Sequence, residues 1–218
     1  MTVKSTIPVY VIDSGCNIPG IETIYSFDNT HVDEHGHGTS MISIISALSN
    51  ASVYSLKIPF QPKLTDILNC LLFLYDNCSP GVLNVSWQME RDPVTENILK
   101  KLSQKEFKIV CPAGHSGITV DEVFPACLPF VINVGSINKK GIITEKCNRP
   151  GVSRTIDLYA NGTNIPAYNK NLDTISITGT SAACAIVSGL LGRKFFETRD
   201  YTKITKHLKF IQKKLEIK

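Results

Sequence analysis

Short apolar runs rich in β-branched residues alternate with longer apolar stretches of helical spacing along most of this chain. The short runs predict strands at 7–12, 53–58, 82–87, 108–112 and 130–135. The longer stretches predict helices at 39–48, 64–76, 93–105 and 181–196. Strands that alternate with helices in this way are typical of a parallel sheet with helices on both faces. The pattern therefore favours an α/β fold of three layers (α/β/α) around a central, mostly parallel sheet.

The length and composition favour a single domain over residues 1–218. The chain has 218 residues, of which 43% are hydrophobic, and this is enough to bury one good core. No apolar run is long enough to span a bilayer. The first strand begins about seven residues from Met1, which leaves no room for the apolar part of a signal peptide.

Positive charge gathers at the C-terminal end. The net charge is +4, but residues 193–218 carry nine Lys/Arg against three Asp/Glu, which leaves residues 1–192 with a balance of −2. Apolar residues recur at helical spacing in this segment, at Tyr201, Ile204, Leu208, Ile211 and Leu215. We expect a basic amphipathic helix that packs on the core and no nucleic-acid partner; a surface for an acidic partner or nucleic acid is the alternative.

The seven cysteines indicate a reducing compartment. Their number is odd and no CxxC spacing occurs, so neither a disulfide framework nor a zinc site is expected. Cys70, Cys111 and Cys184 lie in apolar runs, where a reduced cysteine behaves as a small hydrophobic residue. We therefore expect a cytoplasmic protein. The alternative is an exported protein whose export segment is missing from the given sequence.

Three short segments carry candidate chemistry. Asp13 ends the β-rich run VIDSG, His37 follows a polar loop and precedes a helix, and Ser181 lies between small residues at a helix start. An Asp, a His and a Ser in such positions predict a nucleophilic triad for acyl transfer. In that triad His37 is the base, Asp13 holds the imidazole in the required tautomer, and Ser181 attacks. The backbone N–H of Ser181 is one candidate oxyanion donor.

These segments resemble the subtilisin-like serine proteases. VIDSG, HGHGTS and GTSAA match the three signature segments of that family in their order along the chain, and the resemblance covers roughly residues 7–192. The resemblance implies a subtilisin-like fold and a serine endopeptidase that binds an extended peptide or protein. It also identifies His37, which is followed by Gly38 and Thr39, as the base. His35 is then expected to be a loop residue, and Asp33 and Glu34 are expected to be solvated.

One departure from the family lies in the loop after the strand at 108–112. The family normally has Asn, an oxyanion donor, where this chain has His115. An imidazole N–H can also donate, so His115 and Ser181 are the expected oxyanion hole. Three interpretations stay open: an active protease, a slow or specialised one, and a pseudoprotease that binds peptides.

The expected substrate-binding residues are Ser86, Trp87, Gln88, Ala113 and Gly114. Ser86-Trp87-Gln88 stands where the family usually has Ser-Leu-Gly, so the side chains of Trp87 and Gln88 should narrow the cleft. Phe60-Gln61-Pro62 forms the opposite wall, and Pro62 cannot donate a hydrogen bond to an added substrate strand. We therefore expect selective processing rather than broad degradation, with ester hydrolysis as a further alternative.

The chain also lacks material that other members of the family carry. Only four residues, 49–52, join the helix after His37 to the next strand, where many members insert a calcium-binding loop. We expect no metal site, no cofactor and no pro-segment.

Overall fold

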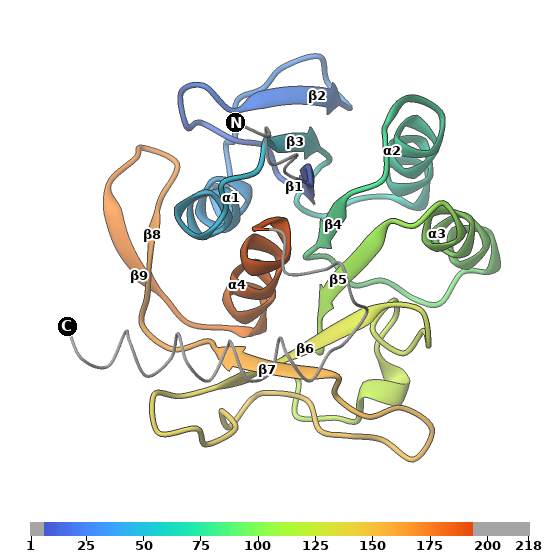
Figure 1. Ribbon diagram of the computed structural model, residues 1–218, viewed down its shortest axis with the longest axis vertical. Helices are drawn as coiled ribbons and strands as arrows, with labels where there is room; N and C mark the ends of the chain where they lie inside the picture. Colours follow the sequence, from blue (N-terminus) through green and yellow to red (C-terminus); the bar gives the residue numbers. More distant parts are fainter. Residues whose placement is uncertain (1–6, 194–218) are drawn as a thin grey trace, which may run out of the picture.

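A seven-stranded sheet forms the centre of the computed structural model, which describes residues 7–193 (Figure 1). The strands are β1 (Val9–Asp13), β2 (Glu22–Ser26), β3 (Val53–Lys57), β4 (Val82–Val85), β5 (Lys108–Pro112), β6 (Ile132–Ile137) and β7 (Leu158–Asn161). They lie in the order β2-β3-β1-β4-β5-β6-β7, and every pairing in this sheet is parallel. A separate antiparallel ribbon pairs β8 (Ile165–Tyr168) with β9 (Thr174–Ile177).

Helices cover both faces of the sheet. On one face α1 (His37–Leu48) packs against α4 (Thr180–Gly192), and on the other α2 (Leu64–Asn77) packs against α3 (Pro93–Gln104) (Figure 1). Alternate side chains of β1 enter different cores: Val9 and Val11 join the cluster under α1 and α4, and Tyr10 and Ile12 join the cluster under α2 and α3. The predicted three-layer α/β/α fold with a mostly parallel sheet is confirmed.

The element boundaries differ from the predicted ones at the edges that matter for the site. Helix α1 begins at His37, two residues before the predicted start. Strand β4 ends at Val85 because residues 86–88 leave the sheet, and Met89 then forms an isolated bridge with Phe124. Helix α4 ends at Gly192; residues 194–196 of the predicted helix, and the predicted basic amphipathic segment from 194 on, lie outside the described residues.

Four strands were not predicted. β2 is an edge strand whose residues are half-buried or exposed, and β8 alternates buried with exposed positions over only four residues. β7 and β9 are also four residues long. Such short, weakly apolar strands have little hydrophobic pattern of their own.

Within residues 7–193, no helix is long and apolar enough to cross a membrane.

The topology gathers the predicted reactive segments at one edge. β1, β4 and β5 are neighbours in a parallel sheet, so their carboxyl ends share that edge. Asp13 ends β1, Ser86 follows β4, and the loop bearing His115 follows β5.

Candidate active site

Asp13 and His37 form a close pair. The Nδ1 atom of His37 lies 2.8 Å from Oδ1 and 2.9 Å from Oδ2 of Asp13. The side chain of Asp13 is only 6% exposed, whereas that of His37 is 26% exposed. An ionised carboxylate accepts only, so Nδ1 carries the proton. In the neutral ring the free lone pair is then on Nε2.

A close contact between two glycine positions brings this pair together. A Cβ atom on Gly38 would lie 2.2 Å from the carbonyl oxygen of Gly15, so the start of α1 approaches the chain just after β1 as only glycine allows. The N–H of Gly38 also donates to Oγ of Ser14, at 2.9 Å. The sequence HGT after the loop therefore sets His37 directly beside the end of β1.

The prediction that Asp33 is solvated is wrong, whereas Glu34 is exposed as expected. Asp33 is 1% exposed. Its Oδ1 accepts from the N–H groups of His35 and Gly36, and its Oδ2 accepts from the N–H and the hydroxyl of Thr39. Asp33 thus binds two N–H groups just before α1 and one in its first turn. An aspartate a few residues before a predicted helix was the available signal.

The pKa of His37 is raised above its ordinary value. Burial disfavours the imidazolium and is the largest single effect, but the charge and hydrogen bond of Asp13, together with the charge of Asp33, outweigh it. His37 therefore gains its proton at a higher pH than a free imidazole does. As the pH falls through that raised value the ring becomes protonated and can no longer accept a proton.

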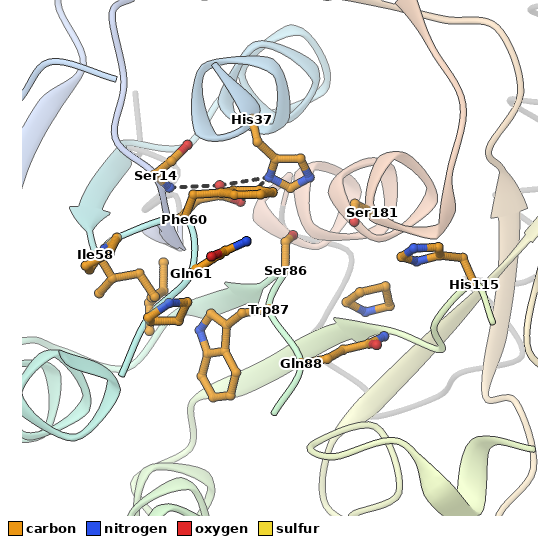
Figure 2. A pocket seen from close by; sticks show the side chains of 15 residues that line it. Ser14, His37, Ile58, Phe60, Gln61, Ser86, Trp87, Gln88, His115 and Ser181 are labelled. Carbon is orange, nitrogen blue, oxygen red and sulfur yellow. Dashed lines mark hydrogen bonds and ion pairs between the residues drawn. The ribbon is translucent and has the colours of Figure 1, made fainter. Parts of the chain in front are cut away.

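Ser181 is the second residue of α4, whose N-cap is Gly179. Together with His37 and His115 it lines a cavity of about 410 Å³, whose walls and reactive side chains are drawn in Figure 2. The same three residues line a second cavity of about 680 Å³ toward β9 and the loop before Asn148. The first-turn N–H groups of a helix have no partner within the helix, and the helix dipole there favours negative charge. Ser181 thus borders both cavities at a helix end that favours negative charge.

His115 lies on an exposed part of the loop after β5. It borders both cavities that Ser181 lines. Ala113 and Gly114, expected to bind substrate, are buried and line neither of these cavities. Pro112, which the sequence analysis did not single out, lines the first cavity instead.

The other expected substrate-binding residues do line the first cavity. Ser86, Trp87 and Gln88 form one wall, opposite the segment 58–62 (Figure 2). The ring of Phe60 stacks on that of His35, with centroids 3.3 Å apart and planes at 11°. This aromatic pair, which the sequence did not reveal, lies beside His37, whose ring centroid is 6.1 Å from that of Phe60.

All seven cysteines lie within the described residues, and all are free thiols. Burial raises the pKa of Cys16 to about 11, and it also raises the pKa values of Cys78 and Cys127. Cys16, Cys78 and Cys127 are therefore not activated nucleophiles. In residues 7–193, no three side chains of His, Cys, Asp or Glu gather as a metal site would need.

Comparisons with known proteins give one consistent likeness. The model of the subtilase family matches residues 6–202. A cuticle-degrading serine protease of Arthrobotrys oligospora is 25% identical over 206 residues, which cover 84% of this chain and 50% of that protein. Subtilisin-like protease 2 of Trichophyton verrucosum is 28% identical over 210 residues, which cover 84% of this chain and 48% of that protein.

A solved structure has a similar fold. A cold-adapted subtilisin-like serine proteinase matches with a TM-score of 0.77 and 23% identity, over 85% of this chain and 73% of that one. This likeness concerns the fold. The chain spans about half the length of the curated relatives that it matches.

Proposed function

Because the chain belongs to the subtilase family of serine proteases, we propose that it is a serine endopeptidase that acts through Ser181, His37 and Asp13. The observation that carries the proposal is the hydrogen-bonded pair of Asp13 and His37, which shares one cavity with Ser181. A serine hydroxyl is a weak nucleophile at neutral pH and needs such a base.

The proposed reaction has two steps. The hydroxyl of Ser181 attacks the scissile carbonyl carbon while Nε2 of His37 takes its proton, and the imidazolium then protonates the leaving amine as the C–N bond breaks. Water attacks the resulting ester with His37 again as the base, and this releases the acid and the free serine. Asp13 stabilises the imidazolium in both steps. The backbone N–H of Ser181 and a ring N–H of His115 donate to the oxyanion.

An extended peptide fits between residues 86–88 and the segment 58–62. The walls of this cleft carry large side chains, Trp87 and Gln88 on one side and Phe60 on the other, stacked on His35. Such walls favour particular substrate side chains over many others. We therefore propose selective processing of a peptide or protein rather than broad degradation.

A second candidate function is peptide binding without turnover. The observation that favours it is His115, because the family normally has an amide donor at this position. The presence of the Asp13–His37 pair beside Ser181 argues for the enzyme instead.

We also propose that the protein works in a reducing compartment such as the cytoplasm. The support is that five of its seven free thiols are buried as small apolar groups in the structure.

Cleavage of a peptide library, read by mass spectrometry, tests the endopeptidase proposal. The parent protein should cut a restricted set of sequences, and the matched Ser181→Ala variant should cut none. Turnover of simple esters with no peptide cleavage would indicate an esterase. Binding of library peptides without cleavage of any would support the pseudoprotease.

A further inference from the structure

Asn148 is a buried residue outside the predicted site, and its side chain contacts the loop that bears His115. It is 1% exposed. Its Oδ1 accepts from the N–H groups of Ser116 and Ile118, at 2.9 and 3.2 Å. Its Nδ2 donates to the carbonyl oxygen of Ala113, at 2.9 Å. One amide thus binds the backbone of this loop on both sides of His115.

Backbone contacts bring the chain around Asn148 alongside the same loop. The N–H of Asn148 donates to the carbonyl oxygen of Gly114 at 3.0 Å, and that of Gly117 donates to Lys146 at 3.2 Å. Gly114 has a φ of +97°, and a Cβ atom there would lie 2.3 Å from Nδ2 of Asn148. The amide therefore packs directly on Gly114, in a backbone conformation that favours glycine.

The His115 side chain has no fixed support of its own. Within residues 7–193 no hydrogen bond holds its ring, although the ring borders both cavities beside Ser181. Its position is therefore set by the backbone at 114–116. That backbone is the part that Asn148 binds.

We propose that Asn148 is a positioning residue for the reaction, which fixes the loop at 113–118 so that His115 faces the developing oxyanion. The proposal rests on the proposed endopeptidase function. An oxyanion donor is effective only within a narrow range of distances, and a misplacement of about 1 Å can cost about 10²-fold in rate. Asn148 does not touch substrate in this account.

The first test is the kinetics of Asn148→Ala in the full chain, with active enzyme counted by titration of Ser181. We expect kcat to fall about ten- to hundredfold with little change in KM, because the oxyanion contact strengthens in the transition state. Asn148→Asp keeps the two accepted hydrogen bonds, but its second oxygen faces the carbonyl oxygen of Ala113, which also accepts only, so kcat should fall in this variant as well. This second variant also serves if Asn148→Ala does not fold.

Asn133→Ala is the matched control. Asn133 is also a fully buried amide that joins two loops, since it donates to Ala126 and Thr155 and accepts from the N–H of Asp157. The Asn133→Ala variant should lower the melting temperature, as Asn148→Ala does, but it should leave kcat unchanged. Equal losses of kcat in the two variants would overturn the positioning role.

A double-mutant cycle with His115→Ala tests the route of the effect. If Asn148 acts through His115, the double variant should lose much less than the product of the two single losses. Independent, multiplicative losses would overturn the proposal while leaving the endopeptidase intact.

A readout without turnover separates this proposal from the proposed function. With labelled histidine, the NMR signal of His115, assigned by its loss in His115→Ala, should shift and broaden in Asn148→Ala but not in Asn133→Ala. If the parent cleaved no peptide, the endopeptidase proposal would fail, and this signal would still decide the role of Asn148. An unchanged His115 signal in Asn148→Ala would overturn it.

Discussion

Asp33→Asn should destabilise the protein strongly, although it changes a single atom outside the predicted triad. The buried Asp33 carboxylate accepts four hydrogen bonds, two at each oxygen, at 2.7–3.2 Å. An asparagine amide keeps one oxygen, and its NH₂ group then faces two donors. Two hydrogen bonds to a charged acceptor are therefore lost, each with a net contribution of about 1.5–3 kcal/mol.

The expected loss is at least about 3 kcal/mol of the free energy of unfolding. For a domain of this size that corresponds to a fall of roughly 6–12 °C in the melting temperature. Calorimetry of the parent, of Asp33→Asn and of Glu34→Gln measures it, because Glu34 is the exposed neighbour and should have almost no effect. A melting temperature for Asp33→Asn within about 1 °C of the parent would refute the reasoning.

The same variant should change the titration of His37. The charge of Asp33 helps to raise the pKa of His37, so its removal should lower that pKa. The acid limb of the pH–rate profile should then move to lower pH in Asp33→Asn. A shift to higher pH would contradict the assigned sign.

Three further predictions concern the site and the thiols. Asp13→Asn should reduce kcat by about 10⁴-fold. It should also move the acid limb of the pH–rate profile to lower pH, because the carboxylate that raises the pKa of His37 is gone while the burial that lowers this pKa stays. His115→Ala should reduce kcat by about 10²–10³-fold with little change in KM, and His115→Asn should keep or raise activity; parental turnover by His115→Ala would place the ring outside the oxyanion hole. Native alkylation should modify the half-buried Cys78 and Cys127 before the five buried thiols, and a loss of two hydrogens per cysteine pair by mass would show disulfides instead.

The hydrophobic pattern was enough to predict the layers and the main parallel strands. Runs such as Val9–Ile12 are buried on both faces, which is typical of a parallel sheet covered by helices. The motif around His37 likewise predicted a helix close after it. The helix begins at His37 itself, and Gly38 and Thr39 in its first turn contact Gly15 and Asp33.

Contacts between distant segments could not be predicted in this way. Lys57 ends β3, and the hydrophobic pattern does not mark it as buried, yet it is 5% exposed and pairs with Asp28 at 2.7 Å. The stacking of His35 on Phe60 and the contact of Asn148 with Gly114 join residues that are far apart in the chain. Their pairing depends on the register of loops, for which the sequence has no periodic signal.

Covalent labelling of Ser181 by a fluorophosphonate tests the central claim most directly. Intact-mass and peptide mass spectrometry should show one adduct on Ser181 in the parent, much slower labelling in Asp13→Asn, and none in Ser181→Ala. A parent protein that stays unlabelled, or a Ser181→Ala variant that is labelled as fast as the parent, would contradict the assignment of the nucleophile.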